Sequence, residues 1–568
     1  MFFSISTVLL STFSVTWAEE SPQVSSNIIP DMSDDIVLQS MHHELYRSFE
    51  WLQNQEVPPY WIELAVTEIE NQELIATNGA FLKHEKETER VLDIDLRVGD
   101  YQLDNTHPMI DGSFFGDEKT HFTDTMPISN NSYLLRKYMW NTMDEAYRTS
   151  VRRLLKIDTN ADIKTEMEDK SGDFSPSAPV LYLDPAQKNT LDMDMWKNVL
   201  KECSAEFLKN ADIIDSSVGV DVINTTKWIV NTDGSIIREY RPHARLWVMA
   251  YTLAEDGMEL TTYEYQDVRD ITTLHNGSAC VSLAQTASDN LSLLRNAPLV
   301  DPYVGPAILR GKATAVFFHE IVGHRAEGHR QKDEDEGQTL TDKVGQSIFP
   351  SFISIIDDPT QAQFQQEDLN GYYQYDDEGV AAQPVTIVEN GILRGFLMGR
   401  SPIENFDTSN GHGRRSAGRA PVSRQGNLFI SSNKSVGYDA LKKALVQEIQ
   451  KQNKPFGLIF DDISGGFTFT GRSTPNSYVV KPVTVWKIYP DGREEMVRGV
   501  DMIGTPLLTF SQIMLASDAY QVFNGVCGAE SGWVPVSAIA PDILLKEVEV
   551  QRRSKDHDLP PLLPPPSK

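Results

Sequence analysis

The chain of 568 residues is strongly acidic, with 81 Asp and Glu residues against 51 Lys and Arg and a formal net charge of −30 at pH 7. Nucleic-acid binding depends on neutralising phosphates with Lys and Arg, so this balance excludes it as the main activity. A chain of this length with 40% hydrophobic residues has room for roughly two to four domains with cores of their own.

The N-terminus has the form of a secretory signal. An apolar run over residues 2–15 is followed by Thr-Trp-Ala, with a cleavage site expected after Ala18. No Lys or Arg precedes the run, and a membrane anchor is the rival interpretation, but the run is shorter than the ~20 residues that span a bilayer. We expect a signal peptide at 1–18, a linker at 19–32, and a secreted or periplasmic protein without stable membrane insertion.

The first half of the remaining chain mixes helical and strand periodicity. Apolar residues recur at helical spacing in three segments, 33–55, 130–156 and 190–210. In two other segments, 60–98 and 211–267, apolar residues alternate with polar residues, as in antiparallel strands. Turns are expected at Asn71-Gln72 and Asn78-Gly79. These patterns predict an N-terminal α+β domain over 33–297, with antiparallel sheets and long helices.

Prolines near residue 300, after a short helix predicted over 289–296, mark the boundary to a second domain over 298–552. Short strands are expected over 354–358, 385–397, 428–431, 457–460, 467–469, 478–489 and 543–550, with one helix at 438–452. This pattern predicts a β-rich barrel-like or sandwich domain. The fold class is therefore two-domain α+β, followed by an extended Pro-rich tail at 553–568.

The second domain opens with a motif suited to metal chemistry. His319 and His324 flank Glu320 in His-Glu-x-x-x-His, which supplies two nitrogen ligands and one candidate general base. The familiar zinc helix has its histidines four residues apart. Five residues place them roughly 140° apart on a regular helix, so we expect a π-bulge or a break near Gly323 to restore convergence. The alternative is a buried, largely apolar helix that carries two histidines without a metal.

A hydrolytic zinc site takes three protein ligands and leaves one position for water, so a third ligand is needed. The downstream candidates are His412, Cys527 and any acidic residue. Cys527 lies among glycines that allow close backbone approach, and a thiolate with two imidazoles suits zinc. Cys203 and Cys280 are able to form a disulfide, but their pairing stays open at this point.

Five ordered motifs make the chain resemble the TldD/PmbA family of metallopeptidases, in its metal-carrying TldD-like branch. They are HEIVGHRAEG (319–328), YDDEGVAAQPVTIVENGILRGFL (375–397), GHGRRS (411–416), residues 497–504, and GVCG (525–528). The resemblance is dense over 307–542, and the N-terminal half is similar only in its general layout.

The resemblance implies roles for four residues. His319, His324 and Cys527 are expected to bind Zn²⁺, and Glu320 is expected to be catalytic. It also implies a two-domain fold, a peptide or an unstructured polypeptide segment as substrate, and a homodimer or a heterodimer with a PmbA-like subunit. It leaves the residues that bind substrate unknown.

The function expected from these features is zinc-dependent peptide hydrolysis outside the cytoplasm, with Glu320 accepting a proton from water. One alternative is a non-catalytic partner subunit of the same fold, and another is a metal-binding, chaperone-like module. The intact Glu320 argues against the non-catalytic subunit.

Other polar clusters allow two interpretations each. The acidic residues 376–378 either form a turn, or orient a ligand histidine or bind a substrate amine. The arginines at 414–415 either pair with that trio or hold a substrate carboxylate. Glu327, three residues after His324, either supports this ligand or is solvated.

Overall fold

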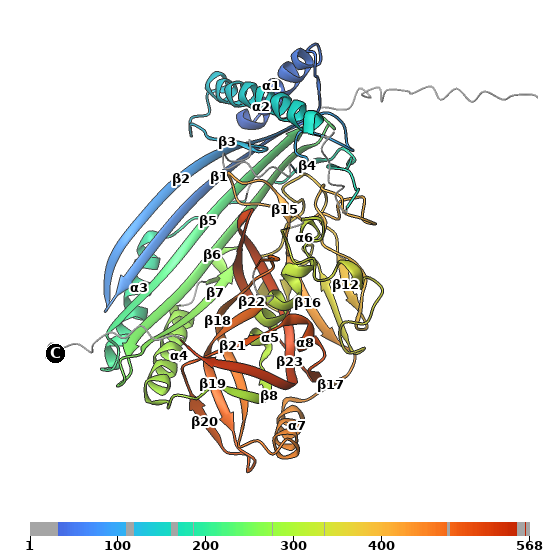
Figure 1. Cartoon of the computed structure of the whole chain (residues 1–568). Helices are drawn as coiled ribbons and strands as arrows, with labels where there is room; N and C mark the ends of the chain where they lie inside the picture. The colour runs from blue at the N-terminus through green and yellow to red at the C-terminus, as the bar shows by residue number, and fades with distance from the viewer. Residues whose placement is uncertain are drawn as a thin grey trace, which may run out of the picture.

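The computed structural model describes residues 32–108, 119–160, 169–185, 187–274, 277–333, 335–473, 477–553 and 563. The predicted signal peptide, all but one residue of the linker and all but two residues of the tail lie outside the described residues. The described part forms a two-domain α+β fold with a β-rich C-terminal domain, as predicted (Figure 1). Within that part, no helix is long and apolar enough to cross a membrane.

In its described residues the N-terminal domain is built on one seven-stranded sheet in the order β3-β2-β1-β5-β6-β4, with β7 paired to β6. Its strands are β1 (Pro59–Thr77), β2 (Ala80–Val98), β3 (Phe122–Thr125), β4 (Leu181–Leu183), β5 (Asp215–Asn231), β6 (Ile236–Leu253) and β7 (Glu259–Val268). All neighbours are antiparallel except β4 and β6. In Figure 1 the long strands form one curved layer beside the C-terminal domain.

The predicted turn at Asn71-Gln72 is wrong. Both residues lie inside β1, where they pair with β2 on one side and β5 on the other. These two neighbours satisfy the backbone hydrogen bonds of β1, so nothing forces a turn there. The chain reverses instead at Asn78 and Gly79, whose φ angles of 49° and 76° suit a two-residue hairpin turn.

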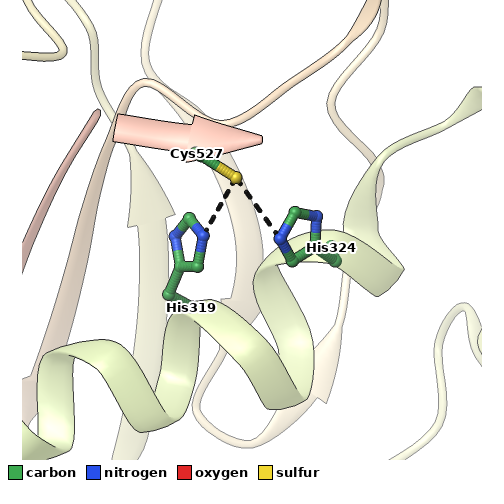
Figure 2. Close-up of side chains that lie close together, drawn as sticks. All are labelled: His319, His324 and Cys527. Carbon is green, nitrogen blue, oxygen red and sulfur yellow. Dashed lines mark hydrogen bonds between the residues drawn. The ribbon is translucent and has the colours of Figure 1, made fainter. Parts of the chain in front are cut away.

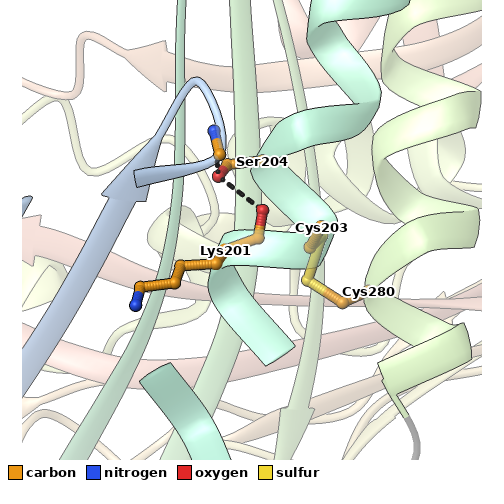
Figure 3. The surroundings of a disulfide bond; sticks show 5 residues. Lys201, Cys203, Ser204 and Cys280 are labelled. Carbon is orange, nitrogen blue, oxygen red and sulfur yellow. Dashed lines mark hydrogen bonds between the residues drawn. A yellow bond between two sulfur atoms is a disulfide. The ribbon is translucent and has the colours of Figure 1, made fainter. Parts of the chain in front are cut away.

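Within the described residues of this domain, four helices pack on the sheet in two groups. They are α1 (Ile36–Leu52), α2 (Ser132–Asn160), α3 (Met193–Ala205) and α4 (Gly277–Asn296). The first two share a hydrophobic core with β1 and β2, and the last two share one with β5, β6 and β7. Short 3₁₀ turns follow α3 and precede α4, at η2 (Glu206–Lys209) and η3 (Ile271–Leu274). Cys203 and Cys280 form a disulfide that joins α3 to α4 (Figure 3).

The C-terminal domain contains a closed ring of strands, which agrees with the barrel-like prediction. The ring is formed by β8 (Tyr303–Leu309), β18 (Gly457–Thr468), β19 (Tyr478–Ile488), β21 (Val500–Gly504) and β23 (Gly532–Arg552). Each of these strands pairs with the next, and β23 pairs back to β8. A hairpin partner of β23, β22 (Ile513–Ala529), carries Cys527.

The remaining elements extend or cover this ring. The further strands are β9 (Ile353–Asp357), β10 (Gln363–Phe364), β11 (Glu367–Asp368), β12 (Val385–Glu389), β13 (Ile392–Leu393), β14 (Gly413–Arg414), β15 (Val422–Ser423), β16 (Asn427–Ser432), β17 (Ser435–Val436) and β20 (Glu494–Val497). The further helices are α6 (His329–Lys332), η6 (Thr341–Lys343), α7 (Tyr438–Lys451) and α8 (Pro506–Phe510).

The helix that carries the motif, α5 (Gly311–Phe318), packs against β18, β22 and β23. Its apolar side chains, such as Phe317 and Phe318, are completely buried in the core of the C-terminal domain. Because this core fixes α5 on one side and β22 on the other, the histidines and Cys527 are held by two rigid elements.

Candidate metal centre

The helix changes its winding where the two histidines lie. After α5, residues His319–Gly323 form a π-helical turn, η4, and a short 3₁₀ turn, η5 (His324–Ala326), follows. The backbone N–H of His324 donates to the carbonyl of His319, which is the five-residue hydrogen bond of a π-helix. The deformation predicted near Gly323 is therefore present, and it brings the histidines to one side.

Gly323 is needed for this geometry because Gln425 approaches it closely. A Cβ atom at position 323 would lie 1.9 Å from Oε1 of Gln425, and Gln425 is itself only 1% exposed. A larger side chain would have to displace a buried neighbour.

The structure brings His319, His324 and Cys527 together (Figure 2). Sγ of Cys527 lies 3.1 Å from Nε2 of His319 and 3.3 Å from Nε2 of His324. The two imidazole rings have centroids 4.9 Å apart and stand edge to face. All three potential ligand atoms lie within 4.8 Å of one another.

Cys527 reaches the histidines because of its place in a strand. It pairs with Val534 of β23, and both side chains are buried, at 5% and 1% exposure, whereas neighbouring Val526 is 60% exposed. This alternation follows from the two-residue period of a strand. The Gly-rich sequence around Cys527 has low β propensity, so the strand was not predicted.

The geometry and the donor types fit zinc. Two imidazole nitrogens and one thiolate form a common zinc-ligand set, and a tetrahedral ion would hold such atoms roughly 3.5 Å apart. The observed separations of 3.1 and 3.3 Å from Sγ are close to that value. Three protein ligands leave the fourth position of a tetrahedral ion for water or substrate.

The three side chains of the cluster are coupled electrostatically. Burial alone would raise the pKa of the Cys527 thiol, but His324 and His319 outweigh it and hold this pKa well below its ordinary value. Burial likewise opposes protonation of the two rings, yet Cys527 raises the pKa of both histidines. A thiolate stabilised beside two imidazoles is ready to exchange protons for a divalent ion.

Glu320 lies next to the cluster in the state expected of a general base. Its side chain is 4% exposed, and within the part of the chain that the structure describes Oε2 has no hydrogen-bond partner. Burial raises the pKa of this carboxyl above its ordinary value, while the neighbouring histidines oppose the rise. Gly466 leaves room for the side chain, since a Cβ there would lie 2.8 Å from Cγ of Glu320.

A large cavity gives access to these residues. It has a volume of about 1080 Å³ and is lined by His319, Glu320, His324 and Cys527, together with residues of both domains. Tyr265 of β7 contributes to the lining, and its hydroxyl donates to the carbonyl of Asn524 at 2.7 Å. The N-terminal sheet therefore forms part of the wall beside the candidate metal centre.

The acidic trio 376–378 lies elsewhere and is structural. Asp376 accepts hydrogen bonds from the backbone N–H groups of Glu378 and Val380, so it forms the turn. Asp377 forms a buried ion pair with Lys227 of the N-terminal domain.

The neighbouring basic residues are also accounted for within the fold. Arg415 forms an ion pair with Asp93 and donates its backbone N–H to Asp377. Arg414 donates to the carbonyl of Gln425. His412 is completely buried with Nε2 3.3 Å from Asp357, so it does not join the candidate metal centre.

Glu327 supports His324 and is not solvated. It is completely buried, and its Oε2 lies 3.2 Å from Nδ1 of His324. Two arginines that the sequence did not single out, Arg330 and Arg424, also contact Glu327. Arg424 lies about a hundred residues away from both the motif and Cys527, so no local pattern signals its role.

Residues 303–552 match the family model described as the PmbA/TldA metallopeptidase C-terminal domain. The C-terminal domain of the chain thus matches the TldD/PmbA family. A metalloprotease TldD homolog of Haemophilus influenzae is 28% identical over 249 residues, which cover 43% of this chain and 48% of that protein. A zinc metalloprotease TldD homolog of Saccharolobus solfataricus is 26% identical over 253 residues, covering 43% and 51%.

The TldD/PmbA likeness at the level of the fold extends further than the sequence alignments. TldE from Thermococcus kodakarensis superposes with a TM-score of 0.59 at 15% identity, covering 90% of this chain and 100% of that one. The two sequence alignments above span about half the length of each relative. The N-terminal half is thus related to the TldD/PmbA fold mainly in its three-dimensional arrangement.

Proposed function

We propose that this TldD/PmbA protein is a zinc-dependent peptidase that acts on peptides or unstructured polypeptide segments. The observation that carries the proposal is the convergence of His319, His324 and Cys527 at the wall of an open cavity, beside Oε2 of Glu320, which has no hydrogen-bond partner among the described residues. The relatives named metalloproteases, one of them a zinc metalloprotease, support the same chemistry.

A zinc ion held by the three ligands would polarise a substrate carbonyl and lower the pKa of water towards about 7. Glu320 would accept a proton from the attacking water on Oε2 and then donate it to the leaving amine. The buried position of Glu320 raises its pKa above the ordinary value, which makes the carboxylate a stronger proton acceptor.

The cavity favours an extended, flexible substrate. Its volume of about 1080 Å³ is too large for a single amino acid, and its lining includes exposed apolar side chains such as Val526 and Trp533. A peptide segment supplies both the length and the apolar groups that such a surface binds.

Assembly and location form further parts of the proposal. The similarity in fold to TldE supports a dimer, either of two copies or with a PmbA-like subunit. The apolar run over residues 2–15 supports action outside the cytoplasm. Export would also provide the oxidising compartment in which the Cys203–Cys280 disulfide forms readily.

A non-catalytic partner subunit is the competing proposal, and the fold similarity to TldE favours it. The complete set of Glu320 and three convergent ligands opposes it, because a subunit without catalysis does not need a buried carboxylate beside a metal site.

The test is hydrolysis of a mixed library of unfolded peptides by the purified full-length protein, with and without a chelator. We expect cleavage that the chelator abolishes and added zinc restores. Zinc bound without any cleavage would favour the non-catalytic or chaperone-like alternatives.

A further inference from the structure

One buried carboxylate next to the candidate metal centre contacts one histidine and two arginines, and one of the arginines is distant in the sequence. Glu327 is completely buried, and its Oε2 accepts from Nε of Arg330 at 2.8 Å and lies 3.2 Å from Nδ1 of His324. Its Oε1 lies 3.4 Å from Nε of Arg424. With the proton on Nδ1, His324 donates to Glu327 and directs the lone pair of Nε2 towards Sγ of Cys527.

Arg424 connects this carboxylate to the strand of the cysteine. Its Nη2 donates to the backbone carbonyl of Cys527 at 2.7 Å, and its Nη1 donates to Oγ of Ser531 at 2.9 Å and to the carbonyl of Gly532 at 3.1 Å. Arg424 is itself 0% exposed. One planar guanidinium thus contacts the side of Glu327 and the end of the β22–β23 hairpin together.

A second connection runs in parallel with the first. Besides Glu327, Arg330 binds Glu530 through Nη2 at 3.0 Å, and Glu530 lies in the turn between β22 and β23. The segment of the histidines and the hairpin of the cysteine are therefore joined by two buried arginines that share one carboxylate.

We propose that Glu327 and Arg424 are positioning residues that hold His324 and Cys527 in register for one metal ion. This inference rests on the proposed zinc binding, and it explains why ligands from two distant segments converge. Without Arg424, the hairpin would lose its hydrogen bonds to the guanidinium, and the position of Sγ would no longer be fixed relative to Nε2 of His324.

The test measures zinc affinity of the full-length protein by competition with a chelator, so it does not depend on peptidase activity. We expect Glu327→Gln and Arg424→Lys to bind zinc about 10- to 100-fold more weakly, as is usual when partners of metal ligands are changed. In the cobalt-substituted protein, we expect the thiolate-to-metal absorption band to weaken in Arg424→Lys, because the cysteine is displaced. A purely structural role would leave this band unchanged.

Asp377→Asn serves as the matched control. Asp377 is also a buried carboxylate in an ion pair, but it contacts Lys227 and Arg415 and no metal ligand. We expect this variant to lose thermal stability and to keep the zinc affinity of the wild type.

Ser531→Ala keeps every charge and removes one hydrogen bond of Arg424. This variant tests the inference if Glu327→Gln and Arg424→Lys do not fold. We expect it to weaken zinc binding by about 2- to 10-fold, the usual range for one hydrogen bond. Unchanged zinc affinity in the folded variants would overturn this inference alone. A wild-type protein that binds no zinc would overturn the proposed function as well.

Discussion

Nε2 of His324 lies 3.3 Å from Sγ of Cys527, although the two residues are 203 positions apart in the chain. His324 directly follows the π-helical turn η4, and Cys527 lies in β22 of the β22–β23 hairpin. Because both are buried and rigidly held, their proximity is a property of the folded core. A metal site formed by these ligands would depend on the packing of the helix against the hairpin.

Cys527→Ala is expected to abolish stoichiometric zinc binding. The change leaves two histidines, which hold zinc weakly in the absence of a third protein ligand. Metal analysis of the purified variant after dialysis checks this, with wild type and Cys203→Ala measured in parallel. Zinc content equal to that of the wild type would remove Cys527 from the site.

Gly323→Ala is expected to destabilise the protein by roughly 1–3 kcal/mol, because the new methyl group would overlap the buried side chain of Gln425. Thermal unfolding monitored by circular dichroism measures the loss. Gly437→Ala is the control, since no atom of the described residues lies within 4 Å of a Cβ at that position. The added substitution Gln425→Ala should recover part of the stability, and a failure to do so would argue against this overlap.

Glu63 is expected to make stability fall as the pH rises through neutrality. Burial raises the pKa of this carboxyl to about 8, while Arg415 and Arg400 oppose the rise. The folded state therefore holds a proton that the unfolded chain, with a pKa near 4.3, releases. The stability that protonated Glu63 contributes is fully present below about pH 4.3. It is lost progressively as the pH rises to about 8, at a rate of at most roughly 1.4 kcal/mol per pH unit.

The measurement for Glu63 compares denaturant unfolding of wild type and Glu63→Gln between pH 5 and 8, a window within the range between those two pKa values. The amide cannot ionise, so the variant should become the more stable of the two as the pH rises. If the free energy of unfolding changed with pH equally in both proteins, the pKa of Glu63 would not be raised in the folded state.

Removing the Cys203–Cys280 disulfide should lower stability without affecting the metal centre. The bridge closes a separation of 77 residues between α3 and α4, and such bridges typically contribute about 2–4 kcal/mol. The double variant Cys203→Ala/Cys280→Ala should unfold at a lower temperature and still bind one zinc per chain. Loss of zinc from a folded double variant would contradict the separation of these two features.

Much of the fold follows from local periodicity in the sequence. The long helices and the β1–β2 hairpin were predicted because apolar spacing and the Asn-Gly turn are local signals. The first half of α4 was missed because it is rich in small and polar residues, and the end of β22 around Cys527 was missed because of Gly525 and Gly528. In these segments the tertiary environment outweighs the intrinsic preference.

Only part of the candidate site could be predicted from the residues themselves. The spacing of His319 and His324 predicts a deformed helix, and the structure contains one. The third position was left open among several residues, and Cys527 was preferred through the resemblance to the TldD/PmbA family. Arg424 carries no signal at all, since its importance arises from contacts between segments about a hundred residues apart.

The most direct test of the account is peptide hydrolysis by zinc-loaded Glu320→Gln beside zinc-loaded wild type. The variant preserves the shape and the three ligands but cannot accept a proton from water. We expect unchanged zinc content and a fall in kcat of about 100-fold or more, the range for loss of general-base catalysis. Equal kcat in the two proteins at equal zinc content would contradict the assignment of Glu320.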